Sequence, residues 1–188
     1  MASYDTLPSS FAAGQILTAL SLQEMLALLN GTGANGGLLD EVFVPKTVDE
    51  TVTSSTAMQN DDALFTALAT SASYRFVCNI RYGAVAAAQI KIGFTVPAGA
   101  TLLWTSFGLD NAVTGANIGG SDFADRGGST PTLGCNTLAT NLLKCNAIGR
   151  VDTTGTAGNL QLQWAQAVSS GTGSVVKAAS FLYVVRVS

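Results

Sequence analysis

The sequence contains no histidine in its 188 residues. This absence excludes Ser-His-Asp and Cys-His nucleophilic sites, zinc sites built on histidine and the usual general base at neutral pH. The acidic groups Asp61-Asp62 and Asp122 with Asp125 lack the alternating spacing of a calcium loop, and nothing marks a glycosidase-type carboxylate pair. We expect these groups to be solvated turns or polar contacts between subunits. The sequence therefore predicts no enzyme activity, no metal site and no cofactor.

Charge is also scarce. Asp, Glu, Lys and Arg make up 11% of the chain, against about 25% in ordinary soluble domains, and hydrophobic residues reach 47%. Such a chain either spans a membrane or hides much of its surface in an assembly. The longest apolar-rich run, residues 16–29, is interrupted by polar residues and is shorter than the ~20 residues that cross a bilayer. We therefore expect no membrane contact, and assembly into a homo-oligomer or a larger particle.

Lysine and arginine are absent from the first 45 residues, and the first basic residue is Lys46. A secretory signal would need a positively charged start, and a nucleic-acid-binding arm would need basic residues. The nine basic residues are scattered singly along the chain, so no stripe for phosphate groups is visible. The sequence predicts no nucleic-acid partner and synthesis in the cytoplasm.

The three cysteines are Cys78, Cys135 and Cys145. Their odd number and wide spacing fit neither a disulfide framework nor a CxxC metal site. Cys78 lies in an alternating segment and is expected to be a small buried apolar residue. Cys135 and Cys145 could meet across a loop, and the sequence leaves open whether they pair.

Residues 1–37 are predicted to form an N-terminal extended arm, one short amphipathic helix and a glycine-rich tether. Ser21 and Glu24 have the spacing of a capping box, and Asn30-Gly31 suits the end of the helix. A helix of two to three turns is marginal in water, so it must dock on the β domain, on a second copy or on another protein. The arm before it is either disordered or extended in a groove of a partner. The residues expected to bind the partner are the apolar ones of arm and helix: Phe11, Ile16, Leu17, Leu20, Leu22, Met25, Leu26 and Leu29.

Residues 38–188 alternate between apolar and polar side chains in short segments separated by turn residues. This pattern predicts a mainly β domain, an antiparallel β-sandwich or a jelly-roll-like fold. Strands are expected at 47–56, 74–82, 90–96, 101–108, 146–153, 160–165 and 175–187, with a polar turn at 59–62 and an exposed loop at 110–131. Residues 63–69 could be a strand or a helical turn. Trp104 and Trp164 are expected in the core, although with Tyr82 and Tyr183 they could form a sugar-binding platform.

Several stretches resemble a β domain that recurs in virion proteins of tailed phages of actinobacteria and related hosts. They are residues 46–56 (KTVDETVTSST), 58–62 (MQNDD), 90–104 (IKIGFTVPAGATLLW) and 154–187, which contains LQWAQ and VKAAS. Residues 13–30 (AGQILTALSLQEMLALLN) are similar to the openings of structural proteins attached to phage heads and tails. The resemblance covers about residues 44–188, and the region between Cys135 and Cys145 departs from it.

The resemblance implies a structural protein of the virion. The first expectation is a capsid decoration protein, a homotrimer on the outside of the phage head, whose residues 1–30 contact the major capsid protein. The alternative is a minor tail or fibre protein whose β domain binds a glycan on the host surface.

Overall fold

The computed structural model describes residues 41–108, 132–133 and 143–187. In these residues the chain forms eleven strands and no helix, and every strand pair is antiparallel. The expected mainly β, antiparallel class is therefore confirmed. The predicted arm, short helix and tether lie outside the described residues, as does the predicted loop at 110–131.

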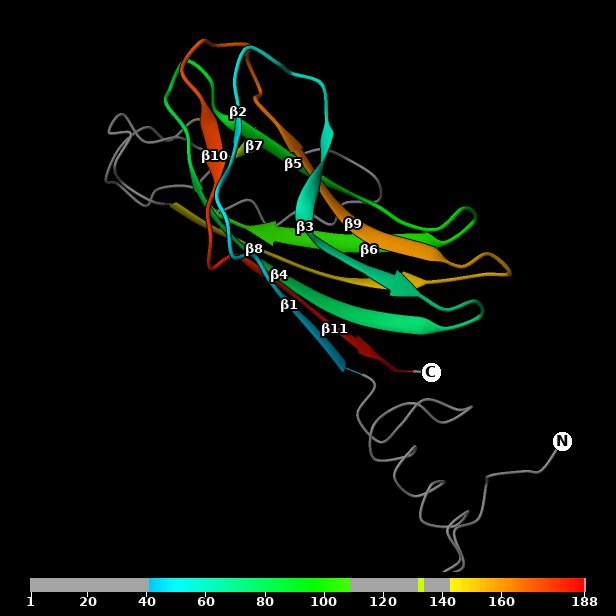
Figure 1. The fold of residues 1–188 in the computed structure, drawn as a ribbon. Helices are drawn as coiled ribbons and strands as arrows, with labels where there is room; N and C mark the ends of the chain where they lie inside the picture. The colour runs from blue at the N-terminus through cyan, green and yellow to red at the C-terminus, as the bar shows by residue number, and fades with distance from the viewer. Residues whose placement is uncertain (1–40, 109–131, 134–142, 188) are drawn as a thin grey trace, which may run out of the picture. The chain divides into compact units, whose positions relative to one another are not determined.

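The strands form two sheets (Figure 1). The larger one, called the large sheet, contains β1 (Glu41–Pro45), β2 (Glu50–Val52), β4 (Ser73–Gly83), β6 (Thr101–Phe107), β8 (Leu143–Asp152), β10 (Ser174–Val176) and β11 (Phe181–Arg186). The small sheet has the spatial order β3 (Gln59–Leu68), β9 (Gly158–Ala165), β5 (Ile90–Thr95) and β7 (Thr132–Leu133).

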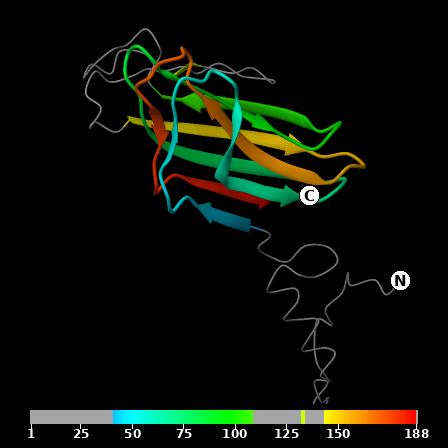
Figure 2. The same cartoon turned by 45° about the horizontal axis from the view of Figure 1, so that its top comes forward.

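The other six strands of the large sheet lie on either side of β4. One edge of β4 pairs with β8, and β8 pairs in turn with β6. The other edge of β4 pairs first with β11 and then with β10. Because β1 pairs with β11 and β2 pairs with β10, β1 and β2 share the outermost row. Figure 2 shows β1, β11, β4 and β8 side by side, from blue through red and green to yellow.

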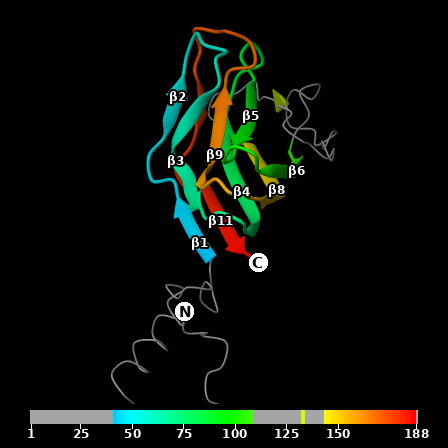
Figure 3. The ribbon, with the colours of Figure 1, turned by 90° about the vertical axis from the view of Figure 1, so that its right-hand side faces the viewer.

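Figure 3 shows the two sheets from the side. One cluster of buried apolar side chains lies between them and joins them. Along β4, Tyr74, Phe76, Cys78, Ile80 and Tyr82 are buried, while the residues between them are more exposed. This alternation confirms the half-buried strand that the sequence predicts. The burial of Cys78 is confirmed as well.

An aromatic contact ties the sheets together at the middle of the core. Phe94 of the small sheet lies between Phe76 and Trp104 of the large sheet, with 5.0 Å between ring centroids in both pairs. The Phe94–Trp104 pair is edge-to-face, the geometry that the ring quadrupoles favour. Trp164 is also fully buried, so the core positions expected for Trp104 and Trp164 are confirmed.

The polar turn predicted at residues 59–62 is wrong, because these residues belong to β3. Asp61 nonetheless makes the contacts typical of a turn residue. Its carboxylate accepts hydrogen bonds from the backbone N–H groups of Ala63 and Leu64. The pairing of β3 with β9 shifts register between Asn60 and Phe65, as in a β-bulge. Residues 63–69, left undecided by the sequence, continue the strand to Leu68.

The single long strand predicted at 175–187 is also wrong, since it is divided into β10 and β11. Ala179 has a φ of 65°, and the Ser180 hydroxyl donates a hydrogen bond to the carbonyl of Lys177, so the chain turns between the strands. The strand expected at 47–56 is shorter for a similar reason. Only Glu50–Val52 forms β2, because the outermost row of strands, made of β1 and β2, is interrupted between Pro45 and Glu50. The two breaks are joined by backbone bonds from Lys46 N–H to the Ser180 carbonyl and from Ala179 N–H to the Lys46 carbonyl.

Candidate functional site

The side of the large sheet that points away from the core is called the outer face. Its side chains alternate with the buried ones along each strand, and the register places them in rows across the sheet. The outer face of the three strands β4, β8 and β6 carries Arg75, Val77, Asn79, Arg81, Lys144, Asn146, Ile148, Arg150, Leu103, Thr105 and Phe107.

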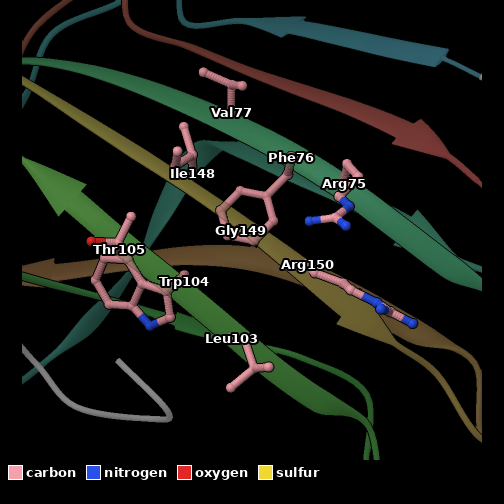
Figure 4. Close-up of a pocket in the computed structure, with 9 residues that line it drawn as sticks. All are labelled: Arg75, Phe76, Val77, Leu103, Trp104, Thr105, Ile148, Gly149 and Arg150. Atoms are coloured by element: carbon pink, nitrogen blue, oxygen red, sulfur yellow. The ribbon is translucent and has the colours of Figure 1, made fainter. Parts of the chain in front are cut away.

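An open depression of about 550 Å³ lies among β4, β8 and β6 (Figure 4). Val77, Ile148 and Thr105 form one cross-strand row of its lining, and Arg75, Arg150 and Leu103 form the next. The depression therefore has an apolar part and a basic part. The Oγ1 atom of Thr105 is buried and has no hydrogen-bond partner among the described residues.

Gly149 makes the sheet thin at this point. It is the cross-strand neighbour of both Phe76 and Trp104, whose side chains fill the core beneath it. A Cβ atom at residue 149 would lie 2.5 Å from Cε1 of Phe76 and 2.6 Å from the carbonyl oxygen of Leu103. Only glycine fits between them, and the aromatic core can approach the backbone of β8 because residue 149 has no side chain.

The outer face is more apolar than most solvated sheet surfaces. Leu103 is 54% exposed and Ile148 is 39% exposed. Beyond β4, the same face continues over Phe181 and Tyr183 of β11 to Phe43 of β1, which is 60% exposed. The rings of Phe43 and Phe181 are 5.2 Å apart. Clustered apolar side chains on a surface of this kind mark contact sites for other molecules.

Basic residues border this apolar surface in two cross-strand pairs. Arg75 of β4 lies opposite Arg150 of β8, and Arg81 lies opposite Lys144. Arg150 forms an ion pair of 2.8 Å with Asp152, whereas Arg75, Arg81 and Lys144 have no ion-pair partner among the described residues. The structure thus collects on two strands four of the nine basic residues, which are scattered singly along the sequence.

A second polar feature lies inside the molecule and connects the two sheets. The ammonium of Lys46, at the break after β1, is 2.9 Å from Oδ2 of Asp61 in β3 and 2.9 Å from Oε2 of Glu50. Lys46 and Asp61 are 3% and 1% exposed. The expectation that Asp61 is a solvated turn residue or a contact between subunits is therefore wrong, since its carboxylate holds a buried lysine. Asp62 is exposed on the opposite side of the strand.

The protonation of this cluster is fixed by its hydrogen bonds. Burial by itself lowers the pKa of Lys46, but hydrogen bonds to Glu50 and Asp61 outweigh it and the pKa is raised. Burial raises the pKa of Glu50, yet hydrogen bonds from Lys46 and from the Asp62 N–H leave it lowered. The Lys46 ammonium and the Glu50 carboxylate therefore stay charged at neutral pH, and the cluster is a structural clamp between the sheets.

The sugar-binding platform considered for Trp104, Trp164, Tyr82 and Tyr183 is not formed. The first three side chains are buried in the core, at 2%, 0% and 0% exposure. Only Tyr183 lies on the outer face, where its hydroxyl donates a hydrogen bond to the carboxylate of Glu41. Alternation along the strands turned both tryptophans inward.

The eight residues predicted to bind a partner lie in residues 1–40, outside the described residues, and the prediction is untested by the structure. Cys135, Asp122 and Asp125 lie outside them too. The outer face itself was missed. Its signal was the equal spacing of Arg75 and Arg81, and of Lys144 and Arg150, six residues apart in alternating segments. An even spacing places each pair on one side of a strand.

Within the described ranges, no helix has the length and apolar character needed to cross a bilayer. The same ranges contain no group of three or more acidic or cysteine side chains arranged to hold a metal ion. No protein-family model matches the chain, and no curated protein matches it.

Proposed function

We propose that this chain is a structural protein of a tailed-phage virion that binds the outside of the assembled head and stabilises it. The observation that carries the proposal is the outer face of the large sheet, where exposed apolar side chains surround an open depression. Such a surface is suited to contact with other proteins, and on a head it would lie against neighbouring copies of the chain while the arm contacts the major capsid protein. The resemblance of residues 46–62, 90–104 and 154–187 to a virion β domain gives that contact its setting.

We also propose a finer description of the fold. The β domain is a jelly-roll-like sandwich, and residues 1–37 add the arm, the short helix and the tether. The protein assembles as a homotrimer, and the apolar residues of the arm and helix contact the major capsid protein and neighbouring copies. Its role is binding, without enzymatic chemistry and without a cofactor.

The mechanism follows from linkage. A ligand that binds only the assembled shell stabilises that state by RT ln(1 + [L]/Kd), which is about 2.7 kcal/mol per site when the free ligand is at a hundred times its Kd. Repetition over the many equivalent sites of a head multiplies this gain. The protein then needs a stable fold and an adhesive surface, and the buried clamp of Lys46 with Asp61 and Glu50 supports such a fold.

The test compares the full chain with a variant that lacks residues 1–30, using heads stripped of decoration. We expect the full chain to sediment with the heads in many copies per particle and to raise their melting temperature. The truncated chain should stay folded, with unchanged circular dichroism, and should not bind. Binding of the truncated chain with undiminished affinity would contradict the role of the arm. A handful of copies located at the tail would favour the tail or fibre alternative.

A further inference from the structure

We propose that the outer face of the large sheet binds residues 1–40 of a second copy of this chain. The inference concerns contact between copies in solution and does not require the virion assignment.

The first step is the charge of the face. Arg75 and Arg81 of β4 lie directly opposite Arg150 and Lys144 of β8, and like charges at opposed positions destabilise a sheet. Apart from Arg150 with Asp152, these residues have no ion-pair partner in the described part of the chain. The Nε atom of Arg81 is buried and has no hydrogen-bond partner there either. Asp152 of the same face pairs with Arg150 and also attracts Arg75, and a bound segment carrying carboxylates would offset the repulsion that remains.

The second step is the charge of the occupant. Residues 1–40 contain Asp5, Glu24 and Asp40 and no lysine or arginine, so their side chains carry a formal charge of −3. Of the nine basic residues, only Arg126 lies outside the described ranges. The chain is thus divided into an acidic N-terminal segment and a domain that holds nearly all of its positive charge. Opposite charges on two such surfaces steer their association.

The third step is the apolar part. Between the basic pairs lie two uncharged rows, Val77 opposite Ile148 and Asn79 opposite Asn146. The pairs are six residues apart along each strand, which corresponds to about 20 Å. The depression at Ile148 and Leu103 can receive an apolar side chain. Residues 11–29 supply many such side chains.

Packing of two identical outer faces is disfavoured, because it would bring the basic pairs of one copy against those of the other. Nucleic acid is a poorer match, because exposed Leu103 and Ile148 lie next to the basic residues on the face. The connection is also favourable. Residue 40 precedes Glu41, which lies in the same cross-strand row as Arg75 and Arg150, at the edge of this sheet. An extended segment of forty residues spans at most about 130 Å, and the mixing of light and heavy chains described below separates a segment of a second copy from the chain's own.

The first experiment measures association of the full chain by sedimentation velocity over a range of concentrations and salt. We expect the wild-type chain to associate and to dissociate as salt rises, since these charges are exposed. Arg75→Glu with Lys144→Glu should weaken association about tenfold or more. Lys91→Glu in β5 is the control for each of the two substitutions made singly, because it makes the same change in charge on the small sheet, and it should leave the affinity within about twofold.

The second experiment identifies the occupant directly and does not depend on a variant that might unfold. A photo-crosslinking amino acid replaces Ile148, and isotopically light and heavy chains are mixed before irradiation. Crosslinks from position 148 to residues 1–40 in light–heavy pairs would support the proposal. Links only within one chain, links only to residues 41–187, or a chain that stays monomeric would each overturn it. So would a monomer that binds a DNA duplex and loses that binding with Lys144→Glu.

Discussion

The Nζ atom of Lys46 lies 2.9 Å from Oδ2 and 3.0 Å from Oδ1 of Asp61, and both side chains are removed from solvent. The pair joins the break after β1 in the large sheet to the bulged strand β3 of the small sheet. Asp61 also accepts two backbone hydrogen bonds within the bulge. One carboxylate therefore fixes both a local backbone shape and a contact between sheets.

Replacing Asp61 should be strongly destabilising. Asp61→Asn leaves the Lys46 ammonium buried with only Glu50 as its charged partner, and loss of one member of a buried pair costs about 3–5 kcal/mol. The free energy of unfolding is measured by urea titration. Asp62→Asn is the control on the next residue, because Asp62 is exposed, and it should change stability by less than about 0.5 kcal/mol. Equal effects of the two variants would contradict the clamp.

The same cluster predicts how stability depends on pH. The pKa of Lys46 is raised from its ordinary value of 10.5, so its contribution is complete below that pH and is lost as pH rises through the folded-state value. The pKa of Glu50 is lowered from 4.5, so its contribution is present above that pH and is lost on acidification.

The comparison is with a double variant, Lys46→Met with Asp61→Leu. The difference in unfolding free energy between wild type and this variant reports the contribution of the charged cluster to stability at each pH. Between about pH 5 and pH 10 this difference should be constant. Below and above that range the wild type should lose stability relative to the double variant. Denaturant unfolding at a series of pH values provides the measurement. A difference that stays flat to pH 11.5 would show that Lys46 does not keep its raised pKa.

Gly149 should not tolerate a side chain. A Cβ atom there would meet the backbone oxygen of Leu103 and the ring of Phe76, and because the oxygen belongs to the backbone the strand itself must shift. We expect Gly149→Ala to cost about 1–3 kcal/mol in urea unfolding. Gly155→Ala is the matched control, since nothing lies within 4 Å of its added Cβ, and its effect should be below about 0.5 kcal/mol.

Cys78 should react with thiol reagents only when the protein unfolds. Burial raises the pKa of its thiol, with a smaller effect from the nearby Cys145, and the thiolate is the reactive form. Alkylation by iodoacetamide, followed by mass spectrometry of the Cys78 peptide, should therefore proceed at the rate set by opening of the core. Destabilising the protein with Gly149→Ala should speed it. Rapid labelling of the native wild type would mean that β4 is accessible from solvent.

Much of the β architecture was predictable because its signals are local. Alternation at 74–82 and 90–96 identifies two strands and the side of each that faces the core, since successive side chains of a strand point to opposite faces. Trp104 and Trp164 were placed in the core on the same grounds. The errors fell where a local backbone feature bulges or interrupts a strand that the alternation alone does not reveal. The turn chemistry of Asp61 produced a bulge within a strand, and Ala179 with Ser180 interrupted a segment that reads as continuous.

The sequence by itself determined that this chain is a β protein without histidine chemistry, with few charges and an acidic, apolar N-terminal segment. Each of these properties is carried by composition or by neighbours in the chain. Only the tertiary structure decided which distant residues meet. It placed Lys46 against Asp61, and it set the register that turns four scattered basic residues into two opposed pairs beside an apolar depression. Alternation gives each residue a face, but pairing depends on contacts between strands far apart in the sequence.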